Sequence, residues 1–465
     1  MHFELNFEFA IMVIEFPLYL HLVWFYFWHY LTGWYWLFLF LILFWSPSAR
    51  PYSFWRWWYW WRYQTRWVTV QVPKWIEIIL PKDIVKPSEA MEVVLENIHK
   101  GFWEPARFWE RWWKGKPDVF DFQFEMVSDG GKIRFYLRTF LGYKIDVLKS
   151  AIYSQYPGIE MREIEDYSRA IPADIPNKNW DVRAGDFTLA KPDFYPIATY
   201  KNWEKQAEVM TKEEKRIDPM AGLIEAMSDL KPGEIIWFQI KPFPISGKYA
   251  KPYVQQAMRV KDQIAQRKVP EKPKSFFSSF IEAIDTLITG PKKKGGEGAG
   301  KIELEAPELR MTPREREICA AIERKASKAL FLVSSIRFVY MAKKEVYNYH
   351  RWRRILEFMG SFCEADMNEF KNLVHTYTKM INPPPLNLFD KRRIYVRKRR
   401  IIRLYQNRYE PKYPFGGDYK WGYFVLSSEE LASVFHFPGR IMAPSPGIKR
   451  VGIRKAEAPP EVPME

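Results

Sequence analysis

Residues 295–301, GGEGAGK, have the G-x-x-x-x-G-K spacing of a loop that binds nucleotide phosphates. Such a loop needs a serine or threonine next, whose hydroxyl binds Mg²⁺, but Ile302 stands there. It also needs a buried strand before it and a helix after it, so that main-chain N–H groups surround the phosphates. Three lysines at 292–294 precede these glycines instead. We therefore interpret 290–301 as a flexible linker that binds no nucleotide.

Other signs of catalysis are weaker still. The sequence has no H-E-x-x-H, G-x-S-x-G or Rossmann glycine pattern. His375 and His436 each stand alone in the sequence. Cys319 and Cys363 are 44 residues apart and fit no metal or redox motif, so we expect two reduced thiols. The sequence therefore predicts no enzyme, no cofactor and no metal site.

The strongest signal for binding is the basic stretch DKRRIYVRKRRIIRLYQNRY at 390–409. Its candidate binding residues are nine cations with no acid among them: Lys391, Arg392, Arg393, Arg397, Lys398, Arg399, Arg400, Arg403 and Arg408. Nucleic-acid phosphates would suit them, with Tyr395 and Tyr405 placed to stack on bases. Anionic lipid or an acidic protein surface would suit the same charges. The net charge of +16 agrees with nucleic acid or anionic lipid as the partner.

The N-terminal region has the composition of a membrane anchor. Residues 17–45 contain no Asp, Glu, Lys or Arg. As a helix they would extend for roughly 43 Å, longer than a ~30 Å hydrocarbon core, so we expect one transmembrane helix here. Residues 1–16 carry three glutamates and no Lys or Arg, whereas 46–74 carry five cations and no acid. This asymmetry predicts an extracytoplasmic N-terminal segment and a cytoplasmic C-terminal body at the cell membrane.

The juxtamembrane segment 46–74 is rich in tryptophan and arginine. Indole rings prefer the headgroup layer, and arginine side chains extend to lipid phosphates. The expected interface residues are Trp55, Arg56, Trp57, Trp58, Trp60, Trp61 and Arg62.

Residues 75–170 predict a first ferredoxin-like domain. Apolar and polar residues alternate in VFDFQFEMV and again in KIRFYLRTF, with Asp129-Gly130-Gly131 as a hairpin turn between them. The order strand, helix, strand, strand, helix, strand is that of a split βαβ unit. The expected strands are 75–80, 119–127, 132–140 and 159–167, and the expected helices are 87–99 and 144–156.

Residues 187–440 predict a second such domain, interrupted by a helical insertion and linker at 244–312. Its expected elements are strands at 196–200, 234–240 and 329–342 and helices at 219–230 and 344–362. Within the insertion, 275–289 has apolar residues at helical spacing, which favours either packing on protein or an in-plane membrane helix. The expected fold class is thus α+β, with a transmembrane helix, two ferredoxin-like βαββαβ units and a Pro-rich tail at 441–465.

Several segments resemble the N-terminal, non-ATPase region of a largely uncharacterised, membrane-anchored family from small-genome bacteria. That family is related to type IV secretion and conjugative DNA transfer, and its longer members continue into a HerA/FtsK-like ATPase. The resembling segments are 119–139, 150–167, 312–342, 421–439 and 458–464. The resemblance implies a membrane-anchored assembly subunit of a secretion or DNA-translocation machine.

The sequence ends at Glu465, where the ATPase of longer members would begin, so we expect a separately encoded ATPase partner and an oligomeric assembly. The helical pattern at 427–439 and the tail are the expected docking region for that motor. A membrane-tethered protein that binds single-stranded nucleic acid is the alternative, although no RNP-type sequence is present. A membrane scaffold unrelated to transfer is the third possibility.

Overall fold

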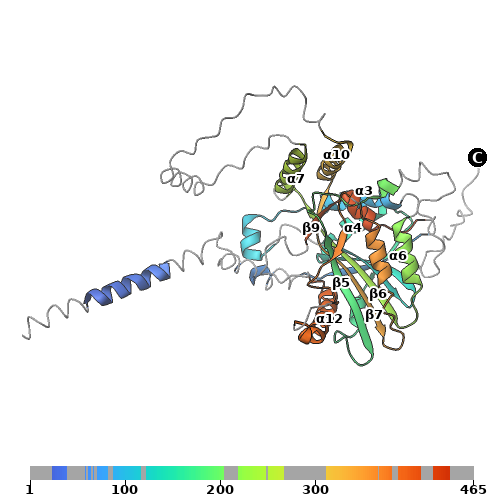
Figure 1. The fold of residues 1–465 in the computed structure, drawn as a ribbon, viewed down its shortest axis with the longest axis horizontal. Coiled ribbons are helices and arrows are strands. Elements are labelled where there is room, and N and C mark those ends of the chain that lie inside the picture. Colours follow the sequence, from blue (N-terminus) through green and yellow to red (C-terminus); the bar gives the residue numbers. More distant parts are fainter. Residues whose placement is uncertain are drawn as a thin grey trace, which may run out of the picture. The chain divides into compact units, whose positions relative to one another are not determined.

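The computed structural model places two compact units, one formed by 1–71 and 105–118 and the other by 72–104 and 119–465 (Figure 1). The structure describes residues 23–38, 58, 61–63, 66, 71–81, 87–116, 122–203, 218–247, 250–265, 311–364, 366–379, 386–409 and 423–439. The linker 290–301, the amphipathic segment 275–289 and the tail 441–465 lie outside these residues.

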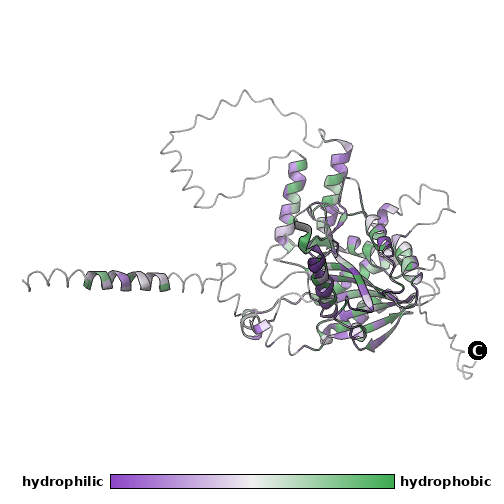
Figure 2. Ribbon diagram, turned by 60° about the horizontal axis from the view of Figure 1, so that its bottom comes forward, coloured by the Kyte–Doolittle hydropathy of each residue, from purple (hydrophilic) through white to green (hydrophobic). Residues whose placement is uncertain are grey.

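The smaller unit contains a helix over 23–38 whose side chains are all exposed. Figure 2 shows hydrophilic and hydrophobic residues interspersed along this helix. Within the described residues, no helix is long and apolar enough to cross a membrane. The expected transmembrane helix is therefore wrong, and the remainder of 17–45 lies outside the described residues.

The larger unit is built on an antiparallel sheet of nine described strands in the order β4-β1-β3-β2-β6-β7-β5-β8, with β9 paired to β7. The strands are β1 (Lys74–Ile79), β2 (Phe122–Asp129), β3 (Lys132–Thr139), β4 (Glu160–Ile164), β5 (Trp180–Leu189), β6 (Glu234–Ile245), β7 (Leu330–Lys343), β8 (Phe370–Asn372) and β9 (Phe424–Ser427).

The expected two ferredoxin-like units are corrected by this topology. The strand orders β4-β1-β3-β2 and β8-β5-β7-β6 do occur, but β2 and β6 pair from Phe124↔Ile240 to Asp129↔Ile235. This pairing joins both halves into one continuous sheet. The segment 196–200 is not a strand, and the first strand of the second half is instead β5. The sequence did not predict β5 as a strand because Arg183, Gly185 and Asp186 at its centre have low strand propensity.

Helices cover both faces of the sheet. Because side chains alternate along a strand, Phe124 and Phe238 point to one face and Glu125 and Trp237 to the other. The first face packs against α3, α4, α6, α11 and α13, and α12 covers the second (Figure 1). The helices are α3 (Pro87–Phe102), α4 (Ile145–Tyr153), α6 (Pro219–Ser228), α7 (Ala250–Ile264), α10 (Pro313–Ser327), α11 (Arg353–Gly360), α12 (Asp390–Gln406) and α13 (Ser428–Val434).

Short helical turns complete the unit: η3 (Gly142–Lys144), η4 (Tyr167–Ala170) and η5 (Leu386–Phe389), while η2 (Glu110–Lys114) belongs to the smaller unit. The helices α7 and α10 lie side by side, and the Lys261 ammonium is 3.5 Å from the Glu323 carboxylate between them (Figure 1). The helix α7 lies within the predicted insertion 244–312 and α10 follows it, so the chain leaves the sheet after β6 along α7 and returns to β7 along α10.

Candidate nucleic-acid interface

The predicted basic stretch forms the single helix α12, whose two halves have different surroundings. Its lysines, arginines and leucine favour helix, and no Gly or Pro interrupts it. The buried residues of α12, Ile401, Ile402, Tyr405 and Gln406, all lie in its last two turns. The N-terminal half is exposed at 391–393 and 395–396. One half therefore anchors the helix, and the other presents charge to solvent.

The anchored half packs on the Trp237 face of the sheet. The Tyr405 ring stacks on the Trp237 indole with centroids 4.5 Å apart. Ile401 and Ile402 join a buried cluster with Val339 and other side chains of the central strands. This contact uses the apolar side of α12 and leaves its opposite side outward.

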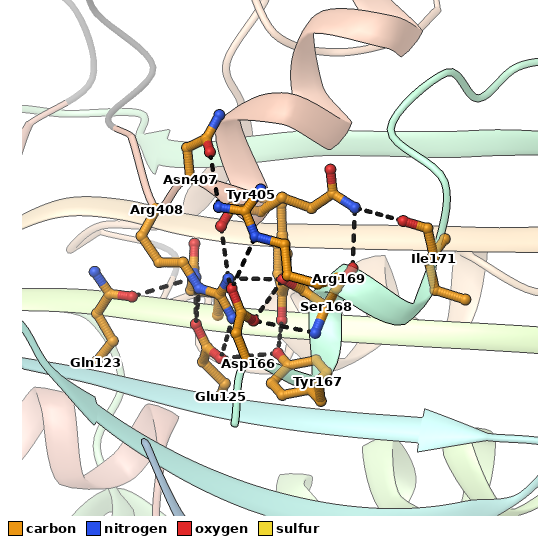
Figure 3. A network of polar contacts seen from close by, with 12 residues as sticks. Gln123, Glu125, Asp166, Tyr167, Ser168, Arg169, Ile171, Tyr405, Asn407 and Arg408 are labelled. Atoms are coloured by element: carbon orange, nitrogen blue, oxygen red, sulfur yellow. Dashed lines mark hydrogen bonds and ion pairs between the residues drawn. The ribbon is translucent and has the colours of Figure 1, made fainter. Parts of the chain in front are cut away.

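Arg408, just beyond α12, is the centre of a buried polar network (Figure 3). Its Nε and Nη2 donate to the two Glu125 carboxylate oxygens at 3.1 and 3.2 Å. Its Nη1 donates to Asp166 at 2.9 Å and to the Ser168 hydroxyl at 2.7 Å. Burial is the largest single influence and opposes the charge, but the surrounding groups, Glu125 foremost and Asp166 among them, together outweigh it and raise the pKa of Arg408. Arg408 is 3% exposed, so this predicted binding residue is a structural cation that an outside ligand does not reach.

The network continues across the sheet as a polar row. Glu125 pairs in register with Gln239, Gln239 with Arg337, and Arg337 with Asp186. Gln239 donates to Glu125 at 2.6 Å, and Arg337 donates to Asp186 at 2.8 Å. All four are almost fully buried, and each carboxylate has a guanidinium partner. Sequence reasoning missed this row, although the polar residues at 123 and 125 alternate with phenylalanines.

Three more of the predicted cations are held by the protein itself. Arg397 donates to the main-chain carbonyls of Val374 and Tyr377 at 2.8 and 3.1 Å. The Lys398 ammonium lies 2.6 Å from the Asp181 carboxylate. The Arg399 guanidinium lies 5.5 Å from the centroid of the Tyr395 ring.

Five other predicted cations have exposed side chains: Lys391, Arg392, Arg393, Arg400 and Arg403. One of them, Arg393, lies 3.8 Å from the Asp390 carboxylate. At about 100° per residue, the four arginines gather opposite the buried face and surround Val396, over a length of about 16 Å. We call Arg392, Arg393, Arg400 and Arg403 the arginine stripe. Guanidinium groups bind phosphate oxygens in pairs, so this surface is suited to a polyanion.

An open hollow lies at the N-terminal end of the arginine stripe. It has a volume of about 410 Å³. Its lining residues are Phe389, Arg392, Arg393, Val396 and Arg397. An aromatic ring and an aliphatic side chain thus lie beside three guanidinium groups. We call this feature the α12 hollow.

A family model described as "Domain of unknown function (DUF8128)" matches residues 90–443, more than half of the chain. The chain belongs to the DUF8128 family. No curated protein matches it. The DUF8128 region includes β2 to β9, the arginine stripe and the Arg408 network, whereas β1 precedes it.

Outside the DUF8128 region, the structure describes only three of the predicted membrane-interface residues. The Arg62 guanidinium lies 4.8 and 5.2 Å from the ring centroids of Trp58 and Trp61. Trp113, which sequence reasoning did not include, contributes a third ring at 5.3 Å. The other predicted interface residues, Trp55, Arg56, Trp57 and Trp60, lie outside the described residues.

The predicted docking helix is α13, inside the DUF8128 region. Ser427 and Glu430 form a reciprocal capping box at its start. All of its residues are buried against the protein's own helices and strands. The helix therefore completes the core of the larger unit and presents no surface to a partner.

Three residues that stood alone in the sequence remain to be placed: His436, Cys319 and Cys363. His436 is fully buried, with Nε2 2.7 Å from Asp218 Oδ2 and Nδ1 2.9 Å from the Ala432 carbonyl oxygen. Cys319 is buried and Cys363 exposed, and neither forms a disulfide. In the part of the chain that the structure describes, no three His, Cys, Asp or Glu side chains gather as metal ligands.

Proposed function

We propose that this protein is a non-catalytic subunit that binds single-stranded nucleic acid through the arginine stripe. The observation that carries the proposal is the division of α12 into an anchored face and an exposed arginine face. The anchored half is fixed by Tyr405 and Arg408, so the exposed guanidinium groups stand on a rigid support. A preordered row of guanidinium groups loses little entropy when it binds phosphates.

The packing of α12 favours nucleic acid over a lipid surface. A helix that lies on a bilayer inserts its apolar face among the acyl chains. The apolar face of α12, with Ile401, Ile402 and Tyr405, is instead buried against the sheet. The opposite side is arginine-rich around Val396. That pattern suits a sugar–phosphate chain that follows the outer face of the helix.

The resemblance to conjugative transfer proteins supports a role for this single-strand binding in DNA transfer. The segments that carry it form the β2–β3 hairpin, α4 and β4, α10 and β7, and β9 with α13, which together make up much of the sheet and its cover. On this proposal the protein holds single-stranded DNA in an assembly, and a separately encoded HerA/FtsK-like ATPase supplies the motion. Co-purification of the full chain with a neighbouring HerA-like ATPase tests this second step.

Fluorescence anisotropy with a labelled oligo-dT strand tests the binding function. The stripe variant carries R392Q, R393Q, R400Q and R403Q. The matched control carries K132Q, R324Q, K344Q and R353Q, which remove the same charge from exposed positions elsewhere. We expect the stripe variant to lose affinity by about 10- to 100-fold because phosphate contacts are lost, and the control by about 3-fold at most. Equal losses in both variants, or no binding by the unaltered chain, would overturn the proposal.

A further inference from the structure

We infer that the α12 hollow seats a nucleobase of the bound strand, with Phe389 as its stacking platform. This inference rests on the proposed nucleic-acid binding and names which part of the ligand is recognised. The hollow lies at the end of the arginine stripe and shares Arg392 and Arg393 with it. A strand whose phosphates follow the stripe would therefore carry its bases past the Phe389 ring.

The two apolar side chains that line the hollow are unusually exposed for large apolar residues. Phe389 is 60% exposed and Val396 is 54% exposed. A single exposed apolar residue is ordinary, but here the two lie together in one hollow. Phe389 directly precedes α12, and its side chain makes no capping hydrogen bond. A phenyl ring has no donor or acceptor with which to cap a helix, and the exposure of this ring leaves it available to an aromatic ligand.

Arg397 forms a preordered cationic rim to the hollow. Its Nη1 donates to the carbonyls of Val374 and Tyr377, which fixes the orientation of the guanidinium. Burial, followed by the charge of Arg393, lowers the pKa of Arg397, and Asp390 only partly offsets these effects. Two like charges at one rim would be relieved by an anion bound beside them. The α12 hollow therefore has an apolar centre and an anion-attracting edge.

This combination selects a nucleotide over simpler ligands. Inorganic phosphate would gain nothing from Phe389 and Val396, and an acyl chain would gain nothing from three arginines. A planar base joined to a phosphate satisfies both parts of the hollow. The bases of a duplex are already stacked and paired, so the seat favours a single strand.

Binding of three ligands to the full chain tests the inference: an oligo-dT strand, an abasic strand of equal length and a duplex. The variants are Phe389→Ala, Phe389→Trp and the exposed-aromatic control Tyr153→Ala. We expect Phe389→Ala to weaken oligo-dT binding by about 10-fold and to leave abasic binding unchanged. Phe389→Trp should retain oligo-dT affinity, and Tyr153→Ala should have no effect. The unaltered chain should prefer oligo-dT to both other ligands.

The failure of this inference can be told apart from failure of the proposed function. Equal affinity of the unaltered chain for oligo-dT and abasic strands, both weakened in the stripe variant, would exclude the base seat and retain phosphate binding. An equal effect of Phe389→Ala on both strands would also exclude the seat. Absence of binding to any of the three ligands would overturn both proposals.

Discussion

Arg403 and Arg408 belong to the same basic run, five residues apart, yet their surroundings are opposite. Arg403 lies on the exposed side of α12. Arg408 is buried, with two hydrogen bonds to Glu125 and one each to Asp166 and Ser168. The comparison shows that a run of cations in a sequence mixes two roles. The difference is set by which residue faces the polar row of the sheet.

The backbone at Arg408 shows how strongly this position is fixed. Its φ angle is 54°, in the left-handed region that usually favours glycine after a helix. The Arg408 N–H donates to the Tyr405 carbonyl, and the Tyr409 N–H donates to the Leu404 carbonyl, which closes the end of α12. An arginine in this conformation costs on the order of 1 kcal/mol. The hydrogen bonds of its side chain offset that cost.

The largest predicted effect is on stability. Arg408→Met should leave the buried Glu125 without its guanidinium partner and should destabilise the larger unit by about 3–5 kcal/mol. Arg403→Met, the matched control, should change stability by about 0.5 kcal/mol at most. Urea unfolding of both variants measures the difference. A small effect of Arg408→Met would mean that the network of Figure 3 does not hold α12 to the sheet.

His436 extends the comparison to a buried cation that titrates. Both ring nitrogens face acceptors, Ala432 O and Asp218 Oδ2, so both N–H groups donate and the imidazolium is the form that fits. Burial is the largest single influence and disfavours this charge, but Asp218 and the Ala432 carbonyl together outweigh it and raise the pKa of His436. The stabilisation is therefore fully present below the unfolded pKa of about 6.5 and is lost as pH rises through the raised folded value.

Unfolding midpoints measured between pH 5.5 and pH 9 should accordingly decrease at the alkaline end. Asp218→Asn should flatten this dependence, because asparagine still caps α6 but no longer carries the carboxylate charge. A variant that retains the full pH dependence would show that another group titrates.

Lys398 has intermediate surroundings and a smaller predicted effect. Its ammonium and the Asp181 carboxylate form a 2.6 Å ion pair at the edge of the α12 contact, with side chains 17% and 28% exposed. Lys398→Met keeps the aliphatic stem and should cost about 1 kcal/mol. The pair-wise coupling measured with Asp181→Asn should account for most of that loss. A coupling energy near zero would show that the Lys398–Asp181 pair does not stabilise the fold, so that Lys398 would resemble the exposed Arg403.

The sequence predicted local elements better than their assembly. Alternation in 119–140 predicted β2 and β3, and Pro87 with its apolar face predicted α3. The β2–β6 pairing was not predictable, because no short turn links these two strands, whereas the hairpin turn at 129–131 links β2 to β3. The sequence also could not separate Arg408 from the arginine stripe, since the distinction depends on Glu125, which lies 283 residues away.

The salt dependence of oligo-dT binding tests the central claim most directly, because it counts phosphate contacts and is insensitive to small changes in fold stability. Log Kobs should fall linearly with log salt, with a slope of about 0.7 per phosphate contact. The account predicts that the stripe variant loses about three units of slope, whereas the K132Q, R324Q, K344Q and R353Q control keeps the slope of the unaltered chain. Equal slopes for the stripe variant and the unaltered chain would show that the arginine stripe does not touch nucleic acid.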